Sequence, residues 1–400
     1  MSLELSKKAL SIKASSTMAI TAQAAEMKNM GIDVVSFGAG EPDFATPEHI
    51  CQAAKRAIDD GYTKYTDAAG MFELREVISH KFHNFNHLDY APDQIVVSNG
   101  GKHSLTNAFT ALLNDGDEVL IPAPYWVSYP AMTILAGGVP VIVKASKENS
   151  YKVTVEQLEA AVTDKTKALV INSPNNPTGM IYSKAELEAI ADLAVKYDFY
   201  VISDEIYEGL FYTEDRHVSI ASLNDEIYKR TITVNGLAKS YAMTGWRIGY
   251  AGAPKEIAVI LKRIQSQQAS NPNSIAQKAA VAAIAGDQTC VREMNQAYNE
   301  RRKYIYNRAI NIKYLSAVEP HGAFYVFVDA TEMFGRKYKG QEITSAADVA
   351  KFLLDDYYVA IVPCADFGFD DHFRLSYAIS MERIEEGMNR IEDFANSLTD

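Results

Sequence analysis

One lysine and one arginine lie eight residues apart in the segment 235–247, and the residues around the lysine change its chemistry. Lys239 follows the apolar residues 237–238 and precedes the largely apolar residues 241–243. Because burial disfavours the charged form, a lysine in such surroundings tends to lose its proton, and the neutral amine is a nucleophile toward aldehydes. Arg247 can hold a phosphate with its planar guanidinium. Pyridoxal 5'-phosphate carries both an aldehyde and a phosphate, although a buried structural lysine explains this segment equally well when it is taken alone.

Further motifs favour the first interpretation of Lys239. They are Gly-Ala-Gly-Glu-Pro-Asp-Phe at 38–44, Asn-Ser-Pro-Asn-Asn-Pro-Thr-Gly at 172–179, Ser-Asp-Glu-Ile-Tyr at 203–207 and Phe-Arg-Leu-Ser-Tyr at 373–377. With these motifs in this order, the chain resembles the class I aminotransferases of the fold-type-I pyridoxal-phosphate superfamily. The resemblance covers essentially the whole chain. It is closest to the bacterial and plant aspartate aminotransferase subgroup that has a lysine in place of the usual distal arginine.

The net charge of −12 argues against general binding to nucleic acid or to an anionic membrane, because both favour basic surfaces. Lys7 and Lys8 precede no sustained apolar stretch, so no secretory signal is evident. The apolar run 279–285 is too short to span a bilayer. The three cysteines are odd in number and scattered, which suits reduced thiols in a cytoplasm and indicates neither a disulfide framework nor a metal site.

Short β-branched runs alternate with helical patterns from about residue 95, which predicts an α/β fold with a mostly parallel central sheet flanked by helices. The predicted strands are 95–97, 118–121, 139–143, 168–171, 200–203, 231–234 and 248–251, and several are apolar throughout, as in a sheet covered on both faces. Helical patterns at 183–197, 255–268 and 289–315 and a strand pattern at 323–328 complete the prediction. The resemblance implies a large cofactor-binding domain at 48–288 and a small α+β domain formed by 1–47 and 289–400, with the boundary in a long connecting helix.

The residues that could carry out chemistry directly follow predicted strands. In chain order they are Gly100 and Gly101 after the first strand, Asn176 after the strand at 168–171, Asp204 after 200–203 and Lys239 after 231–234. In open α/β sheets, ligands bind outside the carboxyl ends of the strands. Four separate segments are therefore expected to converge on one edge of the sheet, which purely structural roles would not predict.

The resemblance assigns the covalent chemistry to Lys239, which would hold the cofactor aldehyde and move a proton between the substrate α-carbon and the cofactor C4′ carbon. Asp204 would keep the pyridine nitrogen protonated, which makes the ring an electron sink. A helix N-cap is the alternative role for this aspartate, and Glu205 is a rival carboxylate that the family pattern does not select. Tyr207 would donate a hydrogen bond to the phenolic oxygen of the cofactor, although a core tyrosine also fits.

Asn176 would contact the same phenolic oxygen and the substrate, although Asn-Pro-Thr-Gly is also good turn chemistry. The backbone amides of Gly100, Gly101 and Lys102 precede a helical run and could meet the phosphate from a helix N-terminus, with Arg247 adding its charge. Many members of the family have a serine just before the lysine or three residues before it. This chain has alanine and glycine at those positions, so one hydroxyl contact to the phosphate is in question.

Four more residues match the family pattern. Trp126 resembles the aromatic residue that stacks on the cofactor ring and contacts substrate, with ordinary packing as the alternative. Arg374 would bind the substrate α-carboxylate in a bidentate fork, together with the backbone amide of Gly40, and a surface salt bridge is the alternative. Tyr65 matches a tyrosine that reaches the phosphate of the neighbouring subunit. That match implies an obligate homodimer, whereas a plain loop tyrosine would imply nothing about assembly.

The expected substrates are an amino acid and a 2-oxo acid, with a dicarboxylate preferred. In the resembling subgroup the lysine after the glycine pair meets the distal carboxylate with help from N-terminal hydroxyls, and Lys102, Ser15 and Thr17 occupy the matching positions. A solvated surface charge or a second phosphate contact would also explain the lysine. The resemblance implies ping-pong transamination of L-aspartate with 2-oxoglutarate, and prephenate as an additional acceptor. An aromatic or alanine aminotransferase, or a pyridoxal-phosphate lyase on the same fold, is the alternative.

Two other classes of protein fit less well. A transcription regulator with an aminotransferase-like domain would carry a DNA-binding domain, whereas only about forty residues precede the first family motif. A nucleotide-binding dehydrogenase would need its glycines at set spacing on the first strand–helix turn, and the segment 99–102 lacks that spacing.

Overall fold

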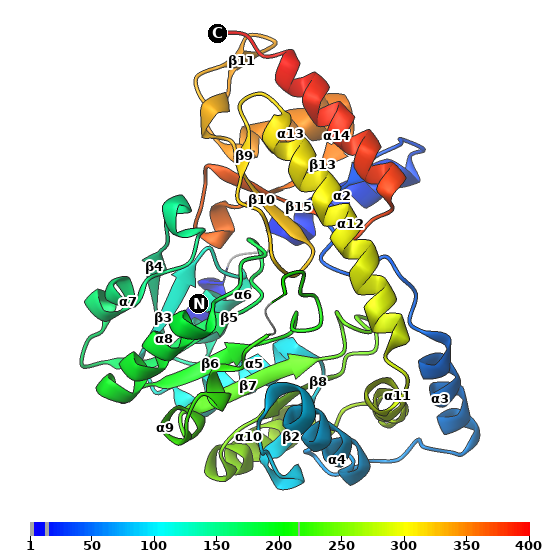
Figure 1. Ribbon diagram of the computed structural model, residues 1–400, viewed down its shortest axis with the longest axis vertical. Coiled ribbons are helices and arrows are strands. Elements are labelled where there is room, and N and C mark those ends of the chain that lie inside the picture. Colours follow the sequence, from blue (N-terminus) through cyan, green and yellow to red (C-terminus); the bar gives the residue numbers. More distant parts are fainter. Residues whose placement is uncertain (1–3, 13–15, 215–216) are drawn as a thin grey trace.

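The computed structural model describes residues 4–12, 16–214 and 217–400, and its central element is a seven-stranded sheet (Figure 1). In their order across the sheet, the strands are β2 (Ile95–Ser98), β8 (Gly249–Gly252), β7 (Thr231–Gly236), β6 (Tyr200–Asp204), β5 (Thr166–Asn172), β3 (Glu118–Ala123) and β4 (Val139–Lys144). Strand β8 is antiparallel to both of its neighbours, and the other pairs are parallel. The mostly parallel sheet expected from the sequence is confirmed.

Helices cover both faces of this sheet. They are α3 (Glu48–Asp59), α4 (Phe72–Lys81), α5 (Gly101–Leu112), α6 (Ser128–Leu135), α7 (Val155–Ala161), α8 (Lys184–Tyr197), α9 (Asp225–Tyr228), α10 (Lys255–Gln268) and α11 (Ser274–Ala285). Val170 of β5 packs in the same cluster as residues of α5 and α10, whereas its neighbours Leu169 and Ile171 pack with residues of α8. Burial on both faces explains why the central strands are apolar throughout.

Helix α8 illustrates how the local sequence specifies these elements. The Ser183 hydroxyl accepts a hydrogen bond from the Glu186 amide, and the Glu186 carboxylate accepts one from the Ser183 amide, which forms a capping box. Leu187, Ile190 and Ala194 then form the buried stripe against the sheet. The helical pattern predicted from Ser183 therefore begins one residue later, because Ser183 is the cap.

The C-terminal part of the chain forms a second, smaller sheet with the order β14-β15-β10-β9. Its strands are β14 (Val362–Pro363), β15 (His372–Ser376), β10 (Tyr325–Asp329) and β9 (Ser316–Ala317), and its helices are α12 (Thr289–Asn311), α13 (Ala346–Tyr357) and α14 (Met381–Asn396). The hairpin of β11 (Lys337–Tyr338) and β12 (Gln341–Glu342) lies beyond β10. Helix α12 ends at Asn311, four residues before the end predicted for it, and it runs alongside both parts of the molecule in Figure 1.

The N-terminal segment packs with this C-terminal part. Its elements are α1 (Lys7–Leu10), α2 (Ser16–Asn29) and β1 (Val35–Ser36), and β1 pairs in parallel with β13 (Val359–Ala360). Phe37 belongs to the same hydrophobic cluster as Phe324, Phe373 and Phe394. Residues more than 280 positions apart in the sequence thus share one core. Within the described part of the chain, no helix is both long and apolar enough to cross a membrane.

Candidate active site

The strand register brings the predicted site residues to one edge of the large sheet. Asn172 at the end of β5 lies opposite Asp204 at the end of β6, and Asp204 lies opposite Val234 of β7. The loop after β7 carries Lys239, and the loop after β5 carries Asn176. The carboxyl ends of parallel strands meet at one edge, so the convergence expected from the strand order is present in the structure.

Lys239 is a half-buried lysine with an altered protonation equilibrium. Its ammonium donates a hydrogen bond to the Gly40 carbonyl oxygen and lies 5.6 Å from the ring centre of Tyr207 and 5.5 Å from that of Phe324. Desolvation lowers the pKa of this amine to about 8, and the charge of Arg374 acts in the same direction. A substantial fraction of the amine is therefore neutral near pH 8 and able to act as a nucleophile or a base.

Asp204 is a buried carboxylate held by neutral donors. The Tyr129 hydroxyl donates to its Oδ2 at 2.7 Å, and the Ile206 amide donates to its Oδ1 at 3.2 Å. Burial raises the pKa of this carboxyl to about 6, against the lowering effect of the Tyr129 hydrogen bond. The contact with Ile206 is a local turn contact and not the cap of a helix, so the N-cap alternative does not describe this aspartate. A cationic ring nitrogen beside Asp204 would favour its ionised form.

Arg374 is buried among partners that are all uncharged. Its Nη1 donates to the Asn176 side-chain oxygen at 2.9 Å, its Nη2 donates to the Gly38 carbonyl at 3.1 Å, and its guanidinium lies 4.4 Å from the Tyr325 ring centre. The residue is 2% exposed, and its Nε has no hydrogen-bond partner among the described residues. A surface salt bridge is therefore the wrong description. A buried arginine that lacks an acidic partner within the described chain is well suited to an anionic ligand.

Tyr207 lies directly beside this arginine site. Its hydroxyl is 2.9 Å from that of Tyr325, and the two rings meet edge to face. Burial raises the pKa of Tyr207 well above its ordinary value, so the hydroxyl stays protonated and can donate a hydrogen bond. The cluster of Lys239, Tyr207, Tyr325 and Arg374 therefore joins the loop after β7, the turn after β6 and the small sheet.

A cradle for an anion lies at the N-terminus of α5. Gly100 precedes the helix with φ at 88°, and a Cβ on it would lie 2.4 Å from Nη2 of Arg247. Arg247 itself has φ at 55° and donates from Nη1 to the Thr244 carbonyl at 2.8 Å. The Arg247 guanidinium therefore lies beside the N-terminus of α5, at a position where only a glycine leaves room for it. A positive side chain next to the free amides of a helix N-terminus fits a phosphate group.

Trp126 and Lys102 lie next to this cradle. The Lys102 ammonium is 4.8 Å from the Trp126 ring centre, and Trp126 packs edge to face on Tyr129. Desolvation and the charge of Arg247 lower the pKa of Lys102, although the residue as a whole is exposed. Trp126 therefore lies between Lys102 at the surface and the ring of Tyr129, whose hydroxyl contacts Asp204.

Some predicted residues lie outside this cluster or contact it in a way that differs from the prediction. Tyr65 is 89% exposed and forms no hydrogen bond with a described residue. Gly40 presents its carbonyl to Lys239, whereas the sequence analysis assigned a role to its amide. Ser15 lies outside the described residues, and Thr17 is described only by its place in helix α2.

Three residues of the cluster were not singled out from the sequence. Tyr129 lies three residues after Trp126, so the motif around that tryptophan could have indicated it. Asn172 begins the 172–179 motif, and its side chain donates to the Asp204 carbonyl at 3.0 Å and accepts from the Asn176 amide at 2.9 Å. Tyr325 begins the buried strand β10, and nothing in its local sequence distinguishes it from a core tyrosine.

Comparisons with known proteins agree with this geometry. The family model for class I and II aminotransferases matches residues 32–391. The aspartate aminotransferase of Geobacillus stearothermophilus is 46% identical, over 98% of this chain and 99% of the relative. The aspartate/prephenate aminotransferase of Nitrosomonas europaea is 43% identical, over 97% of this chain and 99% of the relative.

Solved structures resemble the chain over its full length. The aspartate aminotransferase of Rhizobium meliloti superposes with a TM-score of 0.96 at 40% identity, covering all of both chains. That of Thermus thermophilus, solved with maleate, superposes with a TM-score of 0.92 at 43% identity, covering 98% of this chain and all of the other. With the converging lysine, aspartate and arginines, these matches show that the chain belongs to the class I and II aminotransferase family and is an aminotransferase.

Proposed function

We propose that this enzyme transfers the amino group of L-aspartate to 2-oxoglutarate by a ping-pong mechanism on pyridoxal 5'-phosphate, with prephenate as a further acceptor. The observation that carries the proposal is the buried Arg374, which has no acidic partner among the described residues and lies in the same cluster as the amine of Lys239. Relatives named aspartate or aspartate/prephenate aminotransferase are 43% to 46% identical over nearly the whole chain. An aromatic or alanine aminotransferase and a lyase are less well supported, because the relatives at 43% to 46% identity are named for aspartate. A solved aromatic aminotransferase of Pyrococcus horikoshii is also similar, at 41% identity and a TM-score of 0.86, so an aromatic substrate is the second candidate.

The residues fit the cofactor at both of its ends. The cradle of Gly100, Gly101, the Lys102 amide and Arg247 would hold the phosphate, and Asp204 would pair with the ring nitrogen. Tyr207 and Asn176 would donate to the phenolic oxygen, and Trp126 would cover the ring. When bound, the cofactor supplies a protonated ring that accepts the electron pair left at the substrate α-carbon.

The chain's own groups perform the proton transfers. Lys239 would bind the cofactor aldehyde covalently and, once substrate displaces it, would take the α-proton, because its lowered pKa makes it a base near neutral pH. Asp204 would hold its negative charge next to the protonated ring nitrogen, and Tyr129 would orient that carboxylate. Arg374 would fix the substrate α-carboxylate by both of its outer nitrogens and so present the α-hydrogen to Lys239.

Selection of a dicarboxylate would rest on Lys102. Its ammonium lies over Trp126 and next to the phosphate cradle, where it could meet the distal carboxylate, with Ser15 and Thr17 as the proposed hydroxyl donors. The Thermus thermophilus relative was solved with maleate, which is itself a dicarboxylate.

Two features of the wider molecule belong to the same proposal. The exposed Tyr65 would reach the phosphate of a neighbouring subunit, so the enzyme would act as a homodimer. Residues 48–288 would form the large domain, and residues 1–47 with 289–400 the small one, as the shared core of Phe37 and Phe373 supports. The free thiols of Cys51, Cys290 and Cys364 are compatible with a cytoplasmic enzyme of amino acid biosynthesis.

An absorbance spectrum of the purified protein tests the proposal. We expect a visible band that L-aspartate alone converts to the shorter-wavelength amine form of the cofactor and that 2-oxoglutarate restores. A band that ignores aspartate would overturn the substrate assignment and leave the cofactor in place. Absence of a band after reconstitution with pyridoxal 5'-phosphate would overturn the cofactor assignment.

A further inference from the structure

The turn from Asp204 to Glu208 has two sides with different partners. Asp204 and Tyr207, three residues apart, contact Tyr129 and Tyr325 in the active-site cluster. Glu205 and Glu208 have the same three-residue spacing and contact a separate set of polar residues. A hydrogen bond of 2.9 Å from the Glu208 amide to the Glu205 carbonyl closes the turn. This turn thus places two acids behind the two residues that face the proposed cofactor site.

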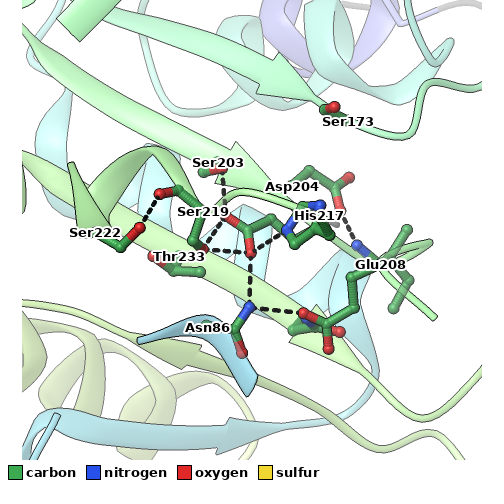
Figure 2. Close-up of polar contacts among 12 residues, drawn as sticks. Asn86, Ser173, Ser203, Asp204, Glu208, His217, Ser219, Ser222 and Thr233 are labelled. Carbon is green, nitrogen blue, oxygen red and sulfur yellow. Dashed lines mark hydrogen bonds and ion pairs between the residues drawn. The ribbon is translucent and has the colours of Figure 1, made fainter. Parts of the chain in front are cut away.

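The Glu205 carboxylate is buried and fully surrounded by donors. The Ser203 hydroxyl donates to it at 2.9 Å, the Ser219 hydroxyl at 2.6 Å and the side-chain NH₂ group of Asn86 at 3.2 Å. The Nε2 atom of His217 lies 2.9 Å from it. In Figure 2, these four residues point toward one carboxylate. Burial would raise the pKa of Glu205, but the charge of His217 and these hydrogen bonds hold it below its ordinary value.

The second acid extends the network to helix α4. Glu208 accepts a hydrogen bond of 2.8 Å from the same side-chain NH₂ group of Asn86. It also forms an ion pair with the ammonium of Lys81, the last residue of α4. Burial would lower the pKa of His217, but the charge and hydrogen bond of Glu205 raise it overall. Each of the two acids is therefore paired with a basic side chain, and the raised pKa of His217 favours its cationic form beside Glu205.

A metal ion is not needed to stabilise these acids. The ligand atoms of Glu205, Glu208 and His217 lie within 4.8 Å of one another, which is close enough to share a cation. However, the Lys81 ammonium already pairs with Glu208, and His217 already pairs with Glu205. Both carboxylates are thus compensated by side chains of the protein itself.

We propose that Glu205 and His217 are positioning residues that hold the turn carrying Asp204 and Tyr207 in its working geometry, an inference that rests on the proposed function. The physical reason is that a carboxylate can accept from all four donors at once. Glutamine would replace one acceptor oxygen by an NH₂ group, so at least one of these contacts would be lost or reversed in direction and the turn would shift. Catalytic groups lose much of their effect when they move by a fraction of an ångström to about 1 Å.

A double-mutant cycle with Glu205→Gln, His217→Gln and the double variant tests this role. We expect each single variant to lower kcat about 10-fold or more while KM for aspartate changes by less than about 3-fold. The pH at which the visible cofactor band titrates should also shift, since Asp204 and Tyr207 would move relative to the ring. If the two residues act as one unit, kcat of the double variant will equal that of the less active single variant.

Glu186→Gln is the matched control. Glu186 is a partly buried acid that pairs with Lys152 and caps α8, and it contacts none of the network residues. This variant should lower the melting temperature while kcat and the band titration remain as in the wild type. If Glu205→Gln behaves in the same way as this control, the network is only a scaffold and the proposal is overturned.

Two further measurements keep the test independent of folding and of the proposed reaction. If Glu205→Gln does not fold, Ser219→Ala removes one donor without changing the charge. This variant should lower kcat and shift the pH at which the band titrates in the same direction, by smaller amounts. Affinity of the apoprotein for pyridoxal 5'-phosphate, read from tryptophan fluorescence, should fall in each variant even if aspartate proves to be the wrong substrate. Stoichiometric zinc in the purified protein, with a band titration that changes when zinc is removed, would overturn the proposal in favour of a metal site.

Discussion

The Arg374 guanidinium and the Asn176 side-chain oxygen are joined by a hydrogen bond of 2.9 Å, although the residues are 198 positions apart. Arg374 lies on β15 of the small sheet, and Asn176 lies in the loop after β5 of the large sheet. The contact therefore crosses between the two sheets at the point where the proposed substrate carboxylate would bind. This hydrogen bond orients the Arg374 guanidinium before a ligand binds.

Substitution of Arg374 tests that orientation. Arg374→Lys keeps the charge but loses the planar guanidinium, so it cannot hold a carboxylate by two parallel hydrogen bonds while Asn176 orients it. We expect kcat/KM for aspartate to fall about 100-fold or more, which corresponds to about 3 kcal/mol. Steady-state kinetics with aspartate and 2-oxoglutarate measure this. A fall of less than 3-fold would contradict a carboxylate-binding role.

The phosphate cradle yields a prediction with a matched control. Gly100→Ala would place a Cβ 2.4 Å from Arg247 Nη2 and force an alanine to a φ of 88°. Gly101→Ala would meet nothing closer than 3.5 Å. We expect the first change to weaken binding of pyridoxal 5'-phosphate to the apoprotein at least about 10-fold, given a strain of 1–2 kcal/mol. The second should leave it within about 3-fold, as fluorescence titration would show, and equal losses would contradict the cradle.

The strands of the fold could be predicted closely from the sequence, because each is a run of apolar residues that is visible in the local sequence. The strands at 95–97, 200–203 and 231–234 are apolar runs, and each is present within a few residues of its predicted bounds. Strand β8 begins at Gly249 and not at 248, and the predicted helix over 289–315 ends at Asn311. Such ends depend on caps and tertiary contacts, which hydrophobic periodicity does not encode.

The site could be predicted only in part, because some of its contacts have no local signature. Lys239 and Asp204 stand out through motifs and through their positions after predicted strands, and Arg374 stands out through its motif alone. Tyr325 does not, because its role follows from the pairing of β10 with β15, in which Phe327 lies opposite Arg374. A residue that acts through such long-range pairing looks like an ordinary core tyrosine in the sequence.

Tyr129 offers a test of how Asp204 is held. Tyr129→Phe removes the hydroxyl that donates to Asp204 Oδ2 at 2.7 Å and lowers the pKa of that carboxyl. We expect the pKa of Asp204 to rise further above about 6, and kcat to fall about 10-fold, in line with 1.5–3 kcal/mol for a hydrogen bond to a charged group. KM for aspartate should change little. Steady-state kinetics across pH would show this, and an unchanged kcat would mean that Tyr129 is only a packing residue.

The lowered pKa of Lys239 predicts that the stability of the apoprotein depends on pH in a specific way. Burial holds its folded pKa at about 8, below the ordinary 10.5, so between these values the unfolded chain binds more protons. Stability due to this group therefore rises with pH from about 8 to 10.5, and below pH 8 the buried charge is a net cost. We expect Lys239→Met to be the more stable apoprotein below pH 8, by on the order of 2 kcal/mol after discounting for solvent. Urea unfolding at several pH values measures the difference, which should shrink as pH approaches 10.5.

The same amine should control the rate of cofactor attachment. Because only the neutral form attacks the aldehyde, the rate at which pyridoxal 5'-phosphate binds covalently to the apoprotein should rise with pH and level off above about 8. Stopped-flow absorbance follows this reaction. A rate that keeps rising to pH 10 would contradict the lowered pKa, and Lys239→Ala should show no covalent phase at all.

Substitution of Lys102 tests the proposal that this residue selects dicarboxylates. Lys102→Ala removes the ammonium that lies 4.8 Å from the Trp126 ring centre but keeps the backbone amide at the phosphate cradle. If the ammonium meets the distal carboxylate, KM for aspartate and 2-oxoglutarate should rise about 10-fold or more, as for a charge-assisted contact of about 1.5–3 kcal/mol. KM for phenylalanine, which has no distal carboxylate, should change by less than about 2-fold. An equal rise for both substrates would instead place the lysine at the phosphate, because loss of a cofactor contact weakens every reaction alike.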